Sequence, residues 1–547
     1  MAVVDLRTAT VSEQLNCALY PDAPVGSTTN SLAITADGET LYAANADNNC
    51  LAVFNVAEAG RSESEGFIPT GWYPTTVRVA GGELLVANAK GLGSYANPDG
   101  PNPYTSRTEE TEYIARMFTG TLGIQTVPDE EELRGLTDLV YGNTPYTKEK
   151  QELAAGVDGG PIPRRVGEAS PIKYVFYIIK ENRTYDQVLG DLPQGNGDAS
   201  LCLFPDSITP NHHALATEFV LLDNYYVDAE VSADGHNWSM AAYATDYTEK
   251  TWPTSYGRRG GSYDYEGSRE IAYPKKGYIW DYCRRAGISY RTYGEFANLN
   301  QTYLESLEGH TATNFPGYNL GIRDTLRYGR WEADFDSLLA IDAVPHFNTV
   351  RFGNDHTAGA RVGNPTPAAM VADNDLAIGL FVEHLSQSPI WDESVVFITE
   401  DDAQNGPDHV DAHRSLMLVV SPYTRRGHVE STMYSTAGAL RTMELILGMP
   451  PMSQYDAAAT PFFACFQPTA DGTPYRARPA NIDLDEENVV RNELSELSER
   501  IDLSREDAVP DELFTAIIWR TVRGLDAAVP APRRGAFIRV GEEDEDD

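Results

Sequence analysis

Short runs of alternating apolar and polar residues, separated by glycine turns, fill the first hundred positions of the chain. SLAI, a DG turn and LYAAN occupy residues 31–45, and TVRV, a GG turn and LLVAN repeat the pattern over residues 76–88. Short strands joined by tight turns, at a period of about 40–50 residues, are typical of the four-stranded blades of a β-propeller. Residues 1–105 are therefore predicted to form a partial all-β propeller of about two blades.

Two blades alone would expose strand edges, because a propeller protects its edges by closing on itself. We therefore expect missing propeller blades or a partner chain to complete this part. Residues 106–165 lack strand alternation and are predicted to be a linker. Within it, residues 129–141 (DEEELRGLTDLVY) favour a short acidic helix, and GGPIPRR at residues 159–165 is a turn-rich boundary.

The second part of the chain has a different pattern. Residues 174–179 (YVFYII) and 395–399 (VVFIT) are continuous apolar runs of strand length, and a helical pattern occupies residues 373–385 between them. Buried strands alternating with helices predict an α/β domain with a mostly parallel sheet flanked by helices. We assign residues 166–535 to this domain and residues 536–547 to an acidic tail.

Acidic and amide residues directly follow both apolar runs. Glu181 and Asn182 come after the first run, and Asp401 and Asp402 come after the second. In parallel sheets ligands bind beyond the carboxyl ends of the strands, so these four residues are expected to meet at one edge of the sheet. Their oxygen atoms are the ligands that hard cations prefer. The pattern therefore predicts a metal site.

Histidines near these strand ends extend the candidate metal site. His409 and His413 lie within the 13 residues that start at Asp401, and Asp355 and His356 are neighbours in a Gly-flanked loop. The mixed set suits Mg, Mn, Ca or Zn without choosing among them. Each acid alone is also compatible with a solvated loop or a helix cap, and the Asp-His pair with an Asx turn. The clustering after a buried strand favours one or two divalent metal ions.

Composition narrows the function. The chain has 42 Lys plus Arg against 81 Asp plus Glu, a formal net charge of −39, which argues against binding to nucleic acid. Only eight of the basic residues are Lys, and an acidic, lysine-poor surface resembles proteins of salt-accumulating halophiles; a merely acidic mesophilic protein is the alternative. Five scattered Cys without a CxxC motif predict neither a disulfide framework nor a thiolate zinc site. The sequence has no apolar run long enough for an integral membrane segment and no signal-peptide pattern at its start.

Several stretches resemble a known family. ENRTYDQVLG at residues 181–190 resembles the first signature of the phosphoesterase and phospholipase C branch of the alkaline phosphatase superfamily, and residues 397–414 (FITEDDAQNGPDHVDAHR) resemble its later metal-binding segment. VSADGHNW at residues 231–238, NDHT at 354–357 and SPYTRRG at 421–427 resemble proteins that fuse a lactonase-like propeller to such a domain. The resemblance implies an alkaline phosphatase-like fold, hydrolysis of phosphate esters, and export to the periplasm or cell surface.

The resemblance also implies roles for individual residues. Glu181 takes the place of the first-strand metal carboxylate with Asn182 beside it, and Asp402 replaces a His seen in many relatives next to Asp401. The candidates for a second metal are Asp355, His356, His409 and His413.

The nucleophile is expected in the stretch of residues 230–245, because the resembling enzymes attack phosphorus with a Ser or Thr at the start of a helix. Counting back three residues from Asn237 selects Asp234, which is also compatible with a helix cap, whereas Ser232 is the nearest preceding hydroxyl. Ser232, Asp234 and hydroxide activated by a metal all remain candidates, and Ser232 is preferred. His236 is a candidate proton donor to the leaving group or a group that orients a phosphate oxygen.

The sequence thus predicts a metal-dependent phosphoesterase that acts on a phosphate-ester substrate, a phosphomonoester or a phosphodiester. A phosphoryl transferase or mutase of the same superfamily is one alternative. A catalytically silent, propeller-based surface binding protein is the other, and the unusual nucleophile position favours it. The two intact strand-end pairs favour the enzyme.

The net charge predicts how stability depends on salt. Self-repulsion among the acids should weaken the fold at low ionic strength, and salt should screen it. Thermal midpoints are expected to rise by several degrees between about 0.1 and about 3 M KCl. Scanning calorimetry across this range is the test, and a flat or falling series would remove the halophile interpretation.

Overall fold

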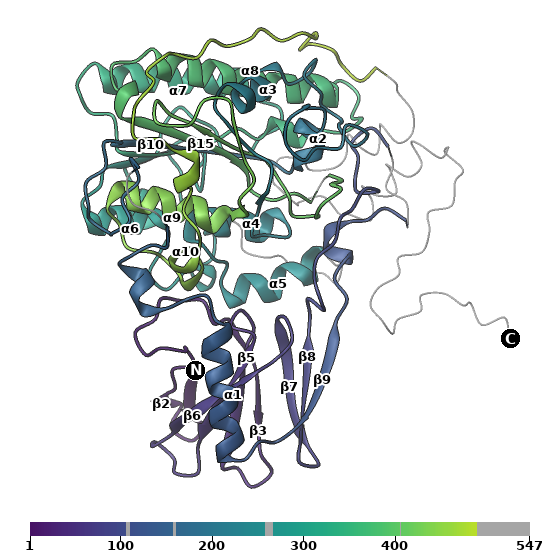
Figure 1. Cartoon of the computed structure of the whole chain (residues 1–547), viewed down its shortest axis with the longest axis vertical. Coiled ribbons are helices and arrows are strands. Elements are labelled where there is room, and N and C mark those ends of the chain that lie inside the picture. The colour runs from purple at the N-terminus through teal and green to yellow at the C-terminus, as the bar shows by residue number, and fades with distance from the viewer. Residues whose placement is uncertain (106–109, 157–159, 257–265, 405, 490–547) are drawn as a thin grey trace, which may run out of the picture.

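A seven-stranded mixed sheet forms the centre of the larger part of the molecule (Figure 1). The computed structural model describes residues 1–105, 110–156, 160–256, 266–404 and 406–489. In spatial order the strands are β13 (Tyr290–Tyr293), β14 (Phe347–Arg351), β10 (Tyr174–Lys180), β15 (Ser394–Glu400), β16 (Met417–Val420), β11 (Val220–Leu222) and β17 (His428–Glu430). Only β16 runs antiparallel to its neighbours in this sheet. The expected α/β fold with a mostly parallel sheet is confirmed.

Helices cover both faces of this sheet. In Figure 1, α3, α7 and α8 lie on one side of β10 and β15, and α4, α6 and α9 lie on the other. The helices of this part are α2 (Tyr185–Leu189), α3 (Pro210–Glu218), α4 (Ser232–Ala241), α5 (Asp246–Tyr256), α6 (Ile279–Ala286), α7 (Asp324–Leu339), α8 (Pro367–Ser386), α9 (Thr436–Leu447) and α10 (Gln454–Ala458). The short strands β12 (Tyr225–Tyr226) and β18 (Tyr434–Ser435) pair beside the main sheet.

The continuous apolar run of β10 reflects burial on both faces. Val175 and Tyr177 belong to the core on the α4, α6 and α9 side, whereas Phe176 and Ile178 belong to the core on the α3, α7 and α8 side. A strand with helices on both faces has no solvent side, so its sequence shows no polar alternation. The predicted strands and the predicted helix at residues 373–385 are confirmed by β10, β15 and α8.

The described residues of an N-terminal module, residues 1–143, form three antiparallel sheets, the helix α1 and the 3₁₀ turn η1. The sheets are β1 (Ala2–Asp5) with β2 (Thr10–Gln14); β3 (Thr29–Ile34), β4 (Thr40–Asn45), β5 (Cys50–Asn55) and β6 (Glu63–Pro69); and β7 (Pro74–Ala80), β8 (Glu83–Asn88) and β9 (Thr121–Thr126). The two predicted hairpins are β3–β4 and β7–β8. A four-stranded and a three-stranded sheet are compatible with a partial propeller, which stays a prediction.

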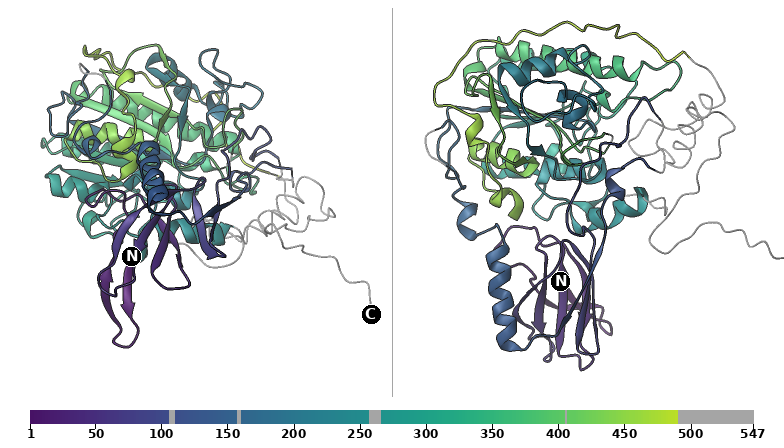
Figure 2. Two further views of the ribbon diagram at one scale, coloured as in Figure 1. Left: turned by 60° about the horizontal axis from the view of Figure 1, so that its bottom comes forward. Right: turned by 45° about the vertical axis from the view of Figure 1, so that its right-hand side comes forward.

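Helix α1 (Glu130–Asn143) packs along β6. The right-hand view of Figure 2 shows this helix beside the N-terminal strands. The predicted acidic helix is therefore present. Gly66 lets the helix approach, since a Cβ there would lie 2.4 Å from the Thr137 hydroxyl oxygen. That hydroxyl accepts the Phe67 N–H at 2.9 Å. Within the predicted linker, β9 extends the β7–β8 sheet, a strand that the sequence pattern did not indicate.

The remaining regular elements are single 3₁₀ turns. They are η1 (Ile114–Arg116), η2 (Lys148–Gln151), η3 (Glu270–Ala272), η4 (Glu305–Leu307), η5 (Asn354–His356), η6 (Trp391–Glu393) and η7 (Phe463–Cys465). The predicted acidic tail, residues 536–547, lies outside the described residues. Among the helices that the structure describes, none combines the length and apolar character needed to cross a membrane.

Candidate active site

The two predicted strand ends meet because of the register of β10 and β15. These strands pair in parallel with Lys180 opposite Glu400. The next residues, Glu181 and Asp401, therefore leave the sheet side by side, and the Asp401 N–H donates to the Lys180 carbonyl oxygen at 3.0 Å. These two residues and the one that follows each of them are at most 1% exposed. The structure thus brings all four strand-end residues into one buried cluster, as the sequence predicts.

Ser232, the first residue of α4, lies against this cluster. Its Oγ donates to Asp402 Oδ2 at 2.7 Å and accepts from Asn182 Nδ2 at 3.2 Å. Asn182 has a φ of 66°, in the left-handed region that Asn tolerates better than most residues. Gly235 allows α4 to come this close, because a Cβ there would lie 2.8 Å from the Asp401 carbonyl oxygen. The helix start and both strand ends therefore form one unit.

Asp234 has different contacts. Its carboxylate accepts the backbone N–H of Glu230 at 3.2 Å and of Val231 at 3.0 Å. Burial, together with the carboxylates of Glu230 and Glu249, raises the pKa of Asp234 well above its usual value. These bonds hold the turn that begins α4, which is a capping function.

His236 lies one helical turn after Ser232 in α4, and each of its ring nitrogens is close to an acidic side chain. Nδ1 contacts Glu295 Oε1 at 2.7 Å, and Nε2 lies 3.2 Å from Asp401 Oδ2. Burial alone would lower the pKa of His236, but the Glu295 and Asp401 carboxylates hold it well above its ordinary value. The two carboxylates, one beside each ring nitrogen, therefore favour the protonated form of His236.

Arg351, the last residue of β14, adds a cation that the sequence did not single out. Its Nε donates to Glu181 Oε1 at 2.7 Å, and its Nη2 lies 3.3 Å from His236 Nε2. Glu295, which follows β13 by two residues, was missed in the same way. Both lie at the same sheet edge as β10 and β15, so the strand-end rule would have found them if β13 and β14 had been recognised as strands.

Several oxygen atoms of the cluster fit a cation. Within the described part of the chain, Glu181 Oε2, Asn182 Oδ1 and Asp401 Oδ1 are buried without a hydrogen-bond partner, whereas Asp401 Oδ2 lies 3.2 Å from His236 Nε2. Buried oxygens of this kind are costly unless a partner satisfies them. Glu181, His236 and Asp401 also present ligand atoms within 4.8 Å of one another. The residues therefore fit a divalent metal ion bound mainly by oxygen.

Asp355 and His356 lie differently with respect to this cluster. Asp355 Oδ1 accepts the Glu181 N–H at 3.2 Å, and its Oδ2 lies 2.8 Å from Lys180 Nζ. Asp355 is therefore next to the cluster but already ion-paired. His356 Nδ1 contacts the Thr357 carbonyl oxygen at 3.0 Å, which directs this ring nitrogen to its own loop.

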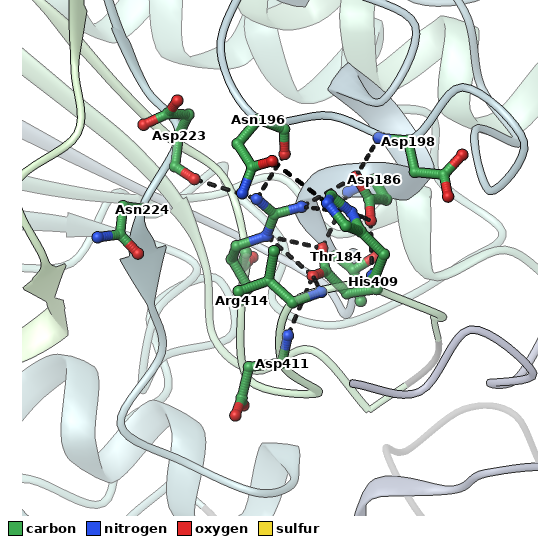
Figure 3. Close-up of polar contacts among 12 residues, drawn as sticks. Thr184, Asp186, Asn196, Asp198, Asp223, Asn224, His409, Asp411 and Arg414 are labelled. Atoms are coloured by element: carbon green, nitrogen blue, oxygen red, sulfur yellow. Dashed lines mark hydrogen bonds and ion pairs between the residues drawn. The ribbon is translucent and has the colours of Figure 1, made fainter. Parts of the chain in front are cut away.

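His409 and His413 make their polar contacts elsewhere in the described structure. His409 Nδ1 lies 2.6 Å from Asp186 Oδ2, in a network around the fully buried Arg414 (Figure 3). Asp186, Asp408 and His409 could by their spacing hold a metal, but the Arg414 guanidinium is within 2.9 Å of both carboxylates and already supplies the positive charge. His413 Nδ1 contacts Asp411 at 2.8 Å.

Comparison with known proteins matches part of the chain to one family. Residues 195–450 match the model of the Phosphoesterase family. The matched range includes α4 and the end of β15, and starts after the end of β10. No curated protein sequence matches the chain significantly.

The similarity to solved structures is low, both in sequence identity and in TM-score. A protein of the alkaline phosphatase superfamily from Vibrio parahaemolyticus is 15% identical, with 57% of this chain and 76% of that chain covered and a TM-score of 0.39. The phosphonate monoester hydrolase of Agrobacterium radiobacter is 13% identical over 51% and 74%, with a TM-score of 0.33. Human ectonucleotide pyrophosphatase/phosphodiesterase 5 is 14% identical over 42% and 56%, with a TM-score of 0.28. TM-scores below 0.5 do not establish a shared fold.

A second group of acids lies behind the start of α4. Glu230, Asp234 and Glu249 present carboxylate oxygens within 4.8 Å of one another. Lys90 of the N-terminal module reaches into this group, with Nζ 2.5 Å from Glu230 Oε1. Burial and the charges of Glu230 and Asp47 raise the pKa of Glu249 to about 8. One lysine thus compensates for several carboxylates.

Replacing Glu249 should change how stability depends on pH. Its pKa is higher in the folded protein than in the unfolded chain, so its contribution to stability is complete below about pH 4.5 and is lost as the pH rises through about 8. Glu249→Gln should therefore match the parent near pH 5 and exceed its thermal midpoint by roughly 1–3 °C near pH 9. Glu131→Gln, on the exposed side of α1, is the control. A variant that is less stable than the parent at pH 9 would contradict the assignment.

Proposed function

We propose that this chain hydrolyses phosphate esters in a metal-dependent reaction with Ser232 as the nucleophile. The observation that carries the proposal is the position of the Ser232 hydroxyl, which starts a helix and is held between Asn182 and Asp402 inside the buried acidic cluster. The match of residues 195–450 to the Phosphoesterase family supports the same chemistry.

The metal ion would be held by the oxygen atoms of Glu181, Asn182 and Asp401, with Asp402 beside them. Three of these residues carry the buried oxygens that have no hydrogen-bond partner in the described structure. A divalent cation bound there would neutralise phosphoryl oxygens and favour the alkoxide form of Ser232.

The chain's own groups account for the proton transfers. Asp402 Oδ2 accepts the Ser232 proton as Oγ attacks phosphorus. The bond from phosphorus to the leaving oxygen then breaks, and the His236 imidazolium donates a proton to that oxygen. Water then attacks the phosphorus of the phosphoserine and gives its proton to His236. The bond from phosphorus to Oγ breaks, Asp402 returns a proton to Oγ, and phosphate leaves, or a phosphomonoester where the substrate was a diester.

Asp234 fits the nucleophile role less well. Its carboxylate is occupied by two backbone N–H groups, and its raised pKa makes it a weaker source of an ionised nucleophile at neutral pH. The hydroxyl two residues earlier is the group that contacts the strand ends.

Metal binding can be located by two substitutions. Glu181→Gln and Asp401→Asn each remove an anionic oxygen from the cluster, so each should lower bound divalent metal to less than about half of the parent value. Elemental analysis of the purified variants measures this directly. His409→Gln is the matched control, because it alters the other metal-like group and should keep the parent occupancy. Full occupancy in both strand-end variants, or loss only in the control, would place the metal elsewhere.

The nucleophile can be identified by trapping. Ser232→Ala should lose at least about 10³-fold in kcat while keeping its metal, because a covalent nucleophile cannot be replaced by a methyl group. Asp234→Asn should retain most of the activity. Acid quench of the parent should yield an acid-stable phosphoserine that is absent only from Ser232→Ala. An alkali- and hydroxylamine-labile phosphoenzyme that disappears in Asp234→Asn would assign the nucleophile to Asp234.

A further inference from the structure

Gln404 contacts the proposed nucleophile, although no sequence pattern marked it as a site residue. Its Nε2 donates to Ser232 Oγ at 3.4 Å, and its backbone N–H donates to Asp402 Oδ1 at 2.7 Å. The side chain is 6% exposed. Gln404 therefore bonds both to the attacking oxygen and to the carboxylate proposed to accept its proton.

The orientation of the Gln404 amide is fixed from outside the α/β part. The Tyr113 hydroxyl donates to Gln404 Oε1 at 2.7 Å. Tyr113 immediately precedes η1, in the segment between β8 and β9 of the N-terminal module. An amide has its acceptor oxygen and donor nitrogen on opposite sides. A donor bound to Oε1 therefore turns Nε2 toward Ser232.

The same segment also holds the chain just beyond Gln404. Asn97 Nδ2 donates to the Gly406 carbonyl oxygen at 2.8 Å. The Asn97 N–H donates to the Asp408 carbonyl oxygen, and the Asp408 N–H returns a bond to Asn97 Oδ1, both at 2.8 Å. Three bonds from one residue fix this backbone relative to the N-terminal module.

We propose that Gln404 is a further catalytic residue of the phosphoesterase site and that Tyr113 is its positioning residue. The N-terminal module thus contributes directly to the active site as well as preceding it in the chain. The inference rests on the proposed function, because it assumes that Ser232 is the attacking group.

The arrangement has a specific kinetic consequence. Negative charge develops on Ser232 Oγ as its proton leaves, and a correctly directed N–H donor stabilises that charge. Without the Tyr113 hydroxyl, the Gln404 amide loses the bond that selects one of its two orientations. The loss falls on the step in which the nucleophile is activated, so kcat should fall while KM changes little.

Three variants test the inference, with 4-nitrophenyl phosphate and bis(4-nitrophenyl) phosphate as probes. Tyr113→Phe should lower kcat about 3- to 30-fold with KM within about 2-fold, and Gln404→Ala should lower kcat about 10- to 100-fold. The double variant should be no slower than Gln404→Ala alone, since Tyr113 acts only through the amide. Tyr95→Phe is the matched control: its side chain is 47% exposed in the same segment, and parent kinetics are expected.

The outcomes separate the inference from the proposed function. If the parent is active, a Tyr113→Phe variant with unchanged kcat, or additive losses in the double variant, would overturn the role of Tyr113 alone. Unchanged kcat in Gln404→Ala would overturn the role of both residues. If the parent cleaves neither ester with any added divalent metal, the proposed function is wrong and this inference falls with it. Thermal midpoints close to the parent's show that a rate change does not come from unfolding.

Discussion

The parallel register of β10 and β15 is the constraint on which the site depends. With Lys180 opposite Glu400, the residues that follow each strand are forced together below 2% exposure. Buried carboxylates need compensating positive charge. Arg351 supplies it to one oxygen of Glu181 and leaves the other oxygen without a partner in the described structure. That oxygen of Glu181 lies where a divalent metal ion is proposed to bind.

The site also requires that the backbone of α4 come close to the end of β15 and that the first turn of α4 keep one orientation. Gly235 permits the helix backbone to contact the Asp401 carbonyl region, because any Cβ would collide with it. Asp234 holds the first turn through two backbone N–H groups. An acid at this position is therefore explained by capping, and of the two nucleophile candidates it is Ser232 whose side chain contacts the strand ends. The spacing argument and the contact argument select different residues because spacing ignores the direction of a side chain.

The structural elements that could be predicted from the sequence are those with a strong local hydrophobic pattern. Two fully buried strands, a long helix and the N-terminal hairpins gave continuous or alternating apolar runs, and the strand-end rule then located the acidic cluster. Strands β13 (YRTY) and β14 (FNTVR) contain polar residues and gave no such signal, so Glu295 and Arg351 were missed. The position of His409 was equally hidden, since its partner network depends on Arg414 and Asp186, which are brought together only by tertiary structure.

The contact between the N-terminal module and the α/β part explains why some site residues are invisible to local patterns. Tyr113 and Gln404 are 291 positions apart; Gln404 lies two residues after Asp402 within the 397–414 segment, but nothing in the local pattern connects it with Tyr113. Lys90 is a second contact between the two parts. Its Nζ lies 5.2 Å from the centre of the Tyr73 ring and pairs with the buried Glu230, which precedes Ser232 by two residues. A buried ion pair adds little net stability, but a misplaced partner leaves an uncompensated charge. The pair therefore favours one docking position of the module, and that position is the one in which Tyr113 reaches Gln404.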